Sequence, residues 1–428
     1  MNPTIKARIE SIRRGEVPEG YKRTKIGIMP NEWGISKIGS VSERIIPGAT
    51  PSTSVKKYWD GNIRWMSSGE IHNRFIYNTK SNITKEGYEV CSTTILPTHC
   101  VLIALAGQGK TRGCVAVNEV ELCTNQSIAA LVPKDIYYLY LFFYLESKYL
   151  ELRKISSGDG TRGGLNISLL NGFQIAIPAH PEQEKIAEIL MGQDRVIELK
   201  EKLLAEKQKQ KKYLMQQLLT GKKRLPGFSC EWRIVKLKEV LKERDEKNVA
   251  QNLEICSVAV QKGVINQIEH LGRSFAASDT SNYNVVLFGD IVYTKSPTGE
   301  FPFGIIKQSQ LDKVAVSPLY GVFKPITYAL GYILHCYFEI PINTNNYLNS
   351  IIQKGAKNTI NISNTTFLSN KLLLPMDEKE QTAIAEILST ADKEIELLKK
   401  DIEQEKLKKK SLMQLLLTGI MRVDELLP

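Results

Sequence analysis

The chain has 428 residues, 42% of them hydrophobic and 24% charged, and its 57 Lys and Arg exceed its 46 Asp and Glu by a formal charge of +11. This length favours two to four domains with ordinary cores, and it excludes both a disulfide-held mini-domain and a chain disordered throughout. The positive surplus favours a polyanionic partner.

The cysteines and the apolar runs indicate the compartment. Seven cysteines occur without a Cys-x-x-Cys pair, which argues against a disulfide framework or a cysteine zinc site and suits a reducing environment. The N-terminus lacks the apolar core of a signal peptide, and the longest apolar run, 136–145, is too short to span a bilayer. We therefore expect a soluble cytoplasmic protein.

An internal duplication is the most informative feature. Residues 182–224 align without a gap to residues 380–422, and 22 of these 43 positions are identical. Upstream, EWGISKI from Glu32 matches EWRIVKL from Glu231, and LNIS from Leu165 matches INIS from Ile360. The period is far longer than that of solenoid repeats, so the chain consists of two tandem halves.

Five segments follow in chain order. The sequence predicts an N-terminal helix and arm at 1–31, a globular module at 32–178, a long helix within 179–224, a second module at 225–375 and a second long helix within 376–428. Both modules alternate short β-rich runs with Gly and Pro turns, which is typical of a mixed α/β (α+β) module with a curved, mostly antiparallel sheet. Trp33 and Trp232 stand at the same point of the repeat, and we assign both to structure.

The two long helices carry a coiled-coil pattern. Strong helix formers fill 182–219, Gly221 is a plausible C-cap, and apolar positions recur at steps of seven with Lys211 and Lys409 in the series. A core helix of a larger fold is the alternative, weakened by the polar stretch 205–212. We expect the helices to pack as an antiparallel coiled coil through eight seam residues: Leu190, Ile197, Leu204, Leu218, Leu388, Ile395, Ile402 and Leu416.

One motif suggests nucleotide binding. ALAGQGKT, from Ala104 to Thr111, fits the loose form of a P-loop, which requires a helix to begin at the lysine so that its N–H groups hold phosphates. The residues that follow, RGCVAVNEVEL, are β-like, and the first glycine of the motif is replaced by Ala104. A two-stranded hairpin tip that displays Lys110 and Arg112 is therefore the preferred interpretation.

Catalytic patterns are otherwise missing from the sequence. It has no glycine-rich adenosylmethionine loop, no amino-methylating N-P-P-[FY] motif and no His-x-x-x-His pair, so we expect neither a catalytic residue nor a bound metal or cofactor. Basic and polar loop clusters remain, and such side chains bond base edges and phosphates. The candidate DNA-binding residues are Lys56, Lys57, Ser67, Ser68, Gln108, Lys110, Thr111, Arg112, Arg162, Lys295, Ser296, Thr298, Lys354 and Lys357.

Two motifs recur in both halves of the chain. They are Pro-x₄-Gln-x₂-Ile-Ala-Glu-Ile-Leu at 178–190 with its relative at 375–388, and Leu-Met-Gln-x-Leu-Leu-Thr-Gly at 214–221 and 412–419. Together with GNIRWMSSGEI at 61–71 and ITKEGYEV at 83–90, which are similar to the start of a target-recognition domain, these segments resemble the specificity (S) subunit of type I restriction–modification systems. The resemblance covers essentially the whole chain.

The resemblance implies a non-catalytic DNA-recognition subunit with a pseudo-two-fold internal repeat. Each of two target-recognition domains would read half of a bipartite, asymmetric DNA site, and the paired helices would set the spacer and dock two methyltransferase (M) subunits. S-adenosylmethionine, ATP and Mg would then be needed only in the partner M and restriction (R) subunits.

Three other interpretations stay open. One is the specificity chain of a fused restriction–modification enzyme of another type, which only the partner genes would separate from a type I subunit. A P-loop enzyme predicts ATP binding that is lost on Lys110→Ala, and a coiled-coil scaffold predicts no DNA sequence preference.

Overall fold

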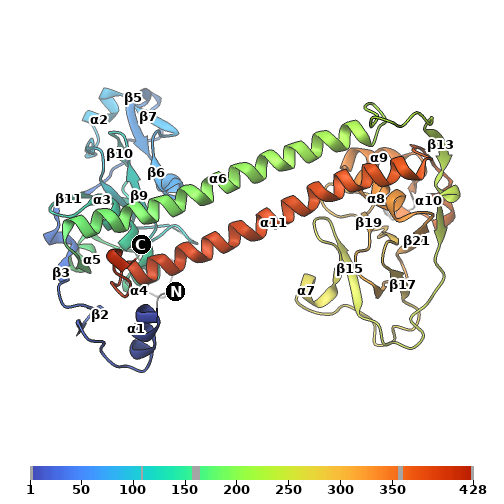
Figure 1. Cartoon of the computed structure of the whole chain (residues 1–428). Coiled ribbons are helices and arrows are strands. Elements are labelled where there is room, and N and C mark those ends of the chain that lie inside the picture. The colour runs from blue at the N-terminus through green and yellow to red at the C-terminus, as the bar shows by residue number, and fades with distance from the viewer. Residues whose placement is uncertain (1–2, 108, 157–163, 355–359, 426–428) are drawn as a thin grey trace. The chain divides into compact units, whose positions relative to one another are not determined.

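The computed structural model describes residues 3–107, 109–156, 164–354 and 360–425. The chain divides into two units, Met1–Lys200 with Asp401–Pro428 and Glu201–Lys400. Two helices of 39 residues, α6 (His180–Leu218) and α11 (Glu378–Leu416), each contribute one part to either unit. Each unit thus combines a globular α/β segment with a stretch of both long helices (Figure 1).

The first unit is built on a five-stranded sheet with the order β4-β11-β8-β9-β6. All its pairings are antiparallel except that of β6 with β9. Residues of β8 alternate between two cores, with Val101 and Ile103 on the face covered by α3 and Leu102 and Ala104 on the other. The strands are β4 (Ser42–Pro47), β6 (Phe75–Ile76), β8 (Val101–Ala104), β9 (Val115–Asn118) and β11 (Ile128–Pro133).

A second sheet of this unit has the order β10-β5-β7, and two small antiparallel pairs, β1–β2 and β12–β3, complete its strands in the described part of the chain. Its remaining strands are β1 (Tyr21–Thr24), β2 (Gly27–Pro30), β3 (Gly34–Lys37), β5 (Trp59–Met66), β7 (Ser81–Ile83), β10 (Cys123–Thr124) and β12 (Gln174–Ile177). Its shorter helices are α1 (Pro3–Arg13), α2 (Lys85–Glu89), α3 (Tyr138–Ser147), α4 (Tyr149–Ile155) and α5 (Ile167–Gly172), with 3-10 turns η2 (Lys56–Tyr58) and η3 (Ser68–Asn73).

The second unit has two four-stranded sheets, β14-β21-β18-β19 and β16-β15-β20-β17, and the small pairs β13–β24 and β22–β23. Its strands are β13 (Arg233–Lys236), β14 (Leu241–Glu243), β15 (Ile255–Ala259), β16 (Gly263–Asn266), β17 (Asn284–Leu287), β18 (Ile291–Tyr293), β19 (Ile306–Gln308), β20 (Lys313–Val316), β21 (Gly321–Pro325), β22 (Gln353–Lys354), β23 (Ile360–Asn361) and β24 (Lys371–Leu374). Its shorter helices are α7 (Gln267–Leu271), α8 (Tyr328–Phe338), α9 (Pro341–Asn349) and α10 (Asn364–Ser369).

The two globular segments repeat one plan. The order β4-β11-β8-β9 corresponds to β14-β21-β18-β19, and β5, with a parallel and an antiparallel neighbour, corresponds to β15. In each unit a helix that follows the central strand, α3 or α8, packs between the sheet and the long helices. The expected mixed α/β fold with two similar, mostly antiparallel modules is therefore observed.

The long helices begin slightly earlier than the periodicity predicts, at His180 instead of Glu182, and each is followed by a glycine in the left-handed conformation. Gly221 has φ +68° and Gly419 has φ +67°, which is the usual geometry of a helix C-terminus. A Cβ at Gly419 would lie 2.5 Å from Pro30 Cδ. No helix in the described residues is long and apolar enough to cross a membrane.

Candidate nucleic-acid interface

A Trp–carboxylate–Arg contact fastens each globular segment to its stretch of the long helices. In the first unit, Trp33 Nε1 donates to Glu182 at 3.0 Å, and Arg422 Nε lies 2.8 Å from the same carboxylate. In the second unit, Trp232 Nε1 donates to Glu380 at 3.2 Å, and Arg224 Nε lies 2.7 Å from it. Since both contacts join a module, the start of one helix and the segment after the other, they explain the repeated tryptophan and the arginine of the repeated Thr-Gly-x-x-Arg sequence.

The glutamine that follows the repeated proline, Gln183 after Pro178 and Gln381 after Pro375, has an equally local role. Gln183 Nε2 donates to the carbonyl of Pro178, and its Oε1 accepts from the backbone N–H of Tyr137 at 2.8 Å. Gln381 repeats the pattern with the carbonyl of Pro375 and the hydroxyl of Thr327. Both amides are buried, so each glutamine satisfies its own hydrogen bonds while it ties α3 or α8 to a long helix.

Two ion-pair clusters lie between the modules and the helices. In the first unit, Arg74 contacts Glu146 at 2.7 Å and Asp194 at 2.9 Å, and Lys409 contacts Asp194 at 2.8 Å. Burial lowers the pKa of Arg74, but the two carboxylates outweigh it and raise that pKa above its ordinary value. Arg74 is therefore held as a cation beneath the sheet.

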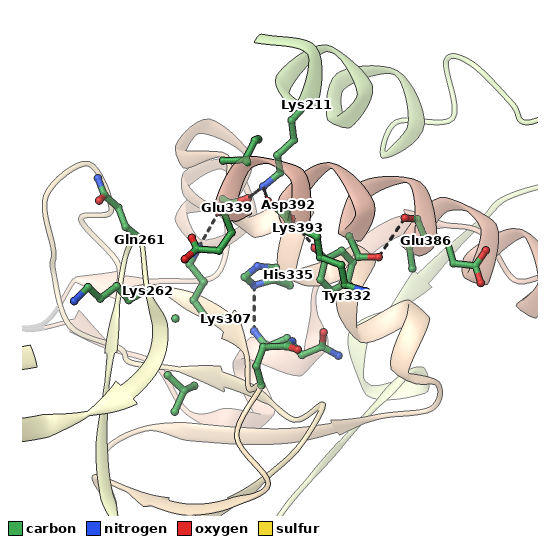
Figure 2. A pocket seen from close by; sticks show the side chains of 18 of the residues that line it. Lys211, Gln261, Lys262, Lys307, Tyr332, His335, Glu339, Glu386, Asp392 and Lys393 are labelled. Atoms are coloured by element: carbon green, nitrogen blue, oxygen red, sulfur yellow. Dashed lines mark hydrogen bonds and ion pairs between the residues drawn. The ribbon is translucent and has the colours of Figure 1, made fainter. Parts of the chain in front are cut away.

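The second unit has an equivalent cluster (Figure 2). Lys211 contacts Asp392 at 2.6 Å and Glu339 at 2.8 Å, and Lys307 contacts Glu339 at 3.2 Å. Although burial opposes it, Lys307 and Lys211 lower the pKa of Glu339 to about 2. His335 lies beside this cluster, where its Nδ1 accepts from the backbone N–H of Gln308 at 3.2 Å, and burial together with Lys307 lowers its pKa to about 4.

The predicted seam residues of the helices fall into the two units. Leu190 and Leu416 share one core in the first unit, and Leu218 and Leu388 share one in the second. Leu204 is half-buried. The other seven are buried, namely Leu190, Ile197, Leu218, Leu388, Ile395, Ile402 and Leu416.

Ion pairs show the helix direction within each unit. In the first unit, Glu182 pairs with Arg422, Asp194 with Lys409 and Lys200 with Asp401. As the residue number in the first helix increases, the number of its partner decreases. Lys207 with Glu394 and Arg224 with Glu380 repeat this in the second. The helix stretches within each unit are antiparallel.

The first candidate recognition residues lie around the β5 strand. Lys56 is exposed on η2, and Lys57 forms an exposed ion pair with Glu86. Ser67 and Ser68 are half-buried, and the Ser67 side chain takes part in a capping box with Glu70 at the start of η3. The Ser67 hydroxyl therefore has a structural partner, Glu70, and Ser67-x-x-Glu70 fits the sequence pattern of a capping box.

The P-loop-like motif lies between two antiparallel strands, β8 and β9, and the described residues that directly follow Lys110 form a turn and not a helix. Lys110 is exposed, while Thr111 and Arg112 are half-buried. His72 on η3 lies 3.3 Å from the Thr111 hydroxyl, so the structure brings the η3 residues and this loop together. This geometry lacks the helix N-terminus that a phosphate cradle requires.

The candidates of the second unit lie on the equivalent β18–β19 connection. Ser296 and Thr298 are exposed, and their hydroxyls bond backbone carbonyls of the same turn. Lys295 is half-buried with φ +56°, and burial lowers its pKa. Lys354 belongs to β22, whereas Gln108, Arg162 and Lys357 lie outside the described residues.

Sequence reasoning missed the ion-pair clusters. It noted Lys211 as an interruption of the apolar seam, but it gave no sign of Glu339, Lys307 or Arg74, because their partners are distant in the chain. The described residues contain no group of three or more His, Cys, Asp or Glu side chains that fits a metal ion.

The comparisons with known proteins agree on one family. Residues 30–209 match the type I restriction modification DNA specificity domain. The type I restriction enzyme MjaIX specificity subunit of Methanocaldococcus jannaschii is 35% identical over 187 residues, which cover 42% of this chain and 42% of that protein. The MjaVIII specificity subunit of the same organism is 26% identical over 437 residues, which cover 95% of this chain and 97% of that protein.

A solved structure extends the likeness to the fold. The S subunit of a type I restriction–modification system from M. genitalium has a TM-score of 0.56 and 13% identity, and the match covers 90% of this chain and 96% of that chain. This similarity shows the fold alone.

Proposed function

Because the chain belongs to the specificity subunits of type I restriction–modification systems, a family that recognises DNA, we propose that each of its two modules binds one half of a bipartite, asymmetric DNA site. One observation carries the proposal. The same sheet order and the same Trp–carboxylate–Arg contact occur in both units, while the loops that connect equivalent strands differ. Such a protein has two different DNA-binding modules attached to two similar long helices.

The two long helices, α6 and α11, suit the role of setting the distance between the two half-sites. Each half-site alone offers a few base contacts at about 1–3 kcal/mol each, so two modules joined by helices add their discrimination and fix the register. We propose that α6 and α11 set the spacer and also recruit two methyltransferase subunits. Leu199 and Leu397, equivalent in the repeat, support the docking role because both are large apolar side chains left 49% and 66% exposed.

We further propose that the chain is not catalytic and binds no cofactor, so that S-adenosylmethionine, ATP and Mg act only in the methyltransferase and restriction subunits. The connection between β8 and β9 supports this, because its described residues form no helix of the kind that a nucleotide-binding loop requires. A specificity chain of another restriction–modification type remains the alternative, and it shares the DNA-reading role.

Module exchange tests this proposal. Residues 33–178 are replaced by the corresponding module of a related specificity subunit, and the methylome of a host that expresses the partner subunits is sequenced. We expect one half-site to change while the other half-site and the spacer stay the same. A change in both half-sites would contradict the modular proposal.

A further inference from the structure

The second unit contains a hollow of about 1340 Å³ between its module and its stretch of the long helices. Figure 2 shows Gln261 and Lys262 on one side of it and Lys393 and Glu386 on the other, with His335 and Lys307 between them. Pockets for small ligands are typically about 300–1,000 Å³, so this hollow fits a polymer segment better than a small molecule.

The first unit shows why the hollow exists. There, 14 residues, 67–80, connect β5 to β7, and they include η3 and the short strand β6, which pairs with the edge of β9. In the second unit the equivalent connection, between β15 and β16, has three residues, 260–262, and β19 is the last strand of its sheet. The space that a chain segment fills in the first unit is therefore open in the second.

The charged side chains at the floor of the hollow already form ion pairs with one another. In the first unit the filling segment supplies Arg74, which pairs with Glu146 and Asp194. In the second unit Lys307, from β19 itself, pairs with Glu339, and Lys211 pairs with Glu339 and Asp392. An occupant therefore need not bring a cation.

The rim of the hollow carries more cations than anions, with four exposed lysines, Lys262, Lys393, Lys399 and Lys400, against the exposed Glu386 and Glu396. Six lysines and four carboxylates line the whole hollow. Lys262, Lys393 and Lys399 are exposed, and within the described parts of the chain no carboxylate lies at ion-pair distance from them. The charge that complements this rim is negative.

A buried hydrogen-bond acceptor without a partner also indicates that the hollow takes an occupant. Gln308 lines the hollow and is 2% exposed. Its Nε2 donates to the carbonyls of Gly289 and Tyr328, but its Oε1 is buried without a hydrogen-bond partner among the described residues. Because such an atom costs free energy, a donor brought by an occupant would stabilise the bound state.

We propose that this hollow receives an extended, acidic segment of the methyltransferase subunit, which takes the place that residues 67–80 take in the first unit. The inference rests on the proposed function, because it names a contact within that assembly. Peptide segments commonly dock beside a free strand edge in this manner. A DNA strand as the occupant is a different proposal, and the test separates the two.

Photocrosslinking from the module side tests the inference. A photoreactive amino acid replaces Lys262, which lies on the β15–β16 turn and not on a long helix, in the complex of the full chain with its methyltransferase subunits and target DNA. We expect crosslinks to one acidic segment of the methyltransferase subunit, identified by mass spectrometry. Crosslinks to DNA alone, to a segment without acidic residues or to nothing would overturn the inference.

A charge-reversal pair provides an independent measurement. Lys262→Glu with Lys393→Glu should weaken binding of the methyltransferase subunit at least tenfold, while Lys238→Glu with Lys242→Glu, an equal charge change at exposed positions away from the hollow, should leave it unchanged. Equal effects of the two pairs would overturn the inference. If the unaltered chain failed to assemble or to direct methylation, the proposed function itself would fail instead.

Discussion

Lys295 combines two unfavourable features that a structural residue would avoid. It has a left-handed backbone, and burial lowers its pKa without a carboxylate at ion-pair distance in the described residues. Strained and desolvated groups gather at binding sites, where a ligand offsets their cost. A DNA phosphate is the ligand that the proposed function supplies.

Lys295→Met should therefore separate stability from binding. Because the folded pKa of Lys295 is below its unfolded value, the charged lysine lowers stability at neutral pH, and this cost fades as the pH rises toward 10. We expect the variant to be at least as stable as the parent at pH 7, to bind DNA more weakly and to show a salt slope smaller by about one. Urea unfolding and DNA titrations at several salt concentrations measure this.

The control for Lys295 is Lys238→Met, which removes the same charge from an exposed position on the same unit. We expect it to change neither the free energy of unfolding nor the affinity for DNA. A Lys295 variant that is less stable and binds DNA normally would assign this lysine a structural role.

His335 predicts a pH dependence of the second unit. Its folded pKa is about 4, against about 6.5 in an unfolded chain. The unfolded state therefore binds a proton that the folded state does not, and stability falls as the pH drops from about 6.5 to about 4, by ~3 kcal/mol at most. Glu339, with a pKa of about 2, loses its contribution only at lower pH.

His335→Gln should remove this loss, because an amide still accepts the N–H of Gln308 but does not titrate. Urea unfolding between pH 7 and pH 4.5, followed by hydrogen exchange in β19 and α8, measures the slope. His270→Gln, at an exposed position, is the control and should keep the parent slope. An unchanged slope in the His335 variant would contradict the assignment.

At the scale of elements, the two helix ends offer a matched comparison. Gly221 and Gly419 both have a left-handed backbone, which costs a side chain about 1 kcal/mol. A Cβ at Gly221 would lie 3.4 Å from Trp232, an ordinary contact, but at Gly419 it would lie 2.5 Å from Pro30. A side chain forced into a space that is already filled typically lowers the free energy of unfolding by about 1–3 kcal/mol more.

We therefore expect Gly419→Ala to lower the free energy of unfolding by about 2–4 kcal/mol and Gly221→Ala by about 1 kcal/mol. Chemical unfolding of the two full-length variants measures the difference. Equal losses would mean that the segment around Pro30 moves away from the end of α11 at little cost.

The helices of this chain could be predicted from its sequence more completely than its sheets and ion pairs. The long helices were predictable because propensity and apolar spacing act along a continuous stretch, as at Leu190, Ile197 and Leu218. The sheet order and residues such as Arg74 were not, since Arg74 acquires its role from Glu146 and Asp194, 72 and 120 positions away. The candidate recognition loops remain predictions, because a loop sequence does not tell whether its side chains face DNA.

For the whole molecule, the repeat explains how the two modules differ while the two long helices stay similar. Some residues of the long helices contact both a module and the segment that follows the other helix, as Glu182 contacts Trp33 and Arg422, so a change there breaks two contacts at once. The loops of the modules have fewer such constraints. Residues 67–80 and 260–262 connect equivalent strands with very different lengths.

Helix length provides the test at this scale. Seven residues inserted into both helices, after Lys200 and after Lys400, preserve the seven-residue apolar repeat and lengthen each helix by about 10 Å. If the helices set the spacer, the methylated site should keep both half-sites and gain about three base pairs between them, since DNA rises about 3.4 Å per base pair. Methylome sequencing of a host with the partner subunits reads this directly.

A seven-residue insertion after Ala277, in an exposed segment of the second unit, is the control and should leave the spacer unchanged. An insertion into α6 alone should abolish methylation instead, because it shifts Lys207 and Lys211 away from Glu394 and Asp392. An unchanged spacer after the double insertion would mean that the bound DNA, and not the length of the helices, determines the distance between the half-sites.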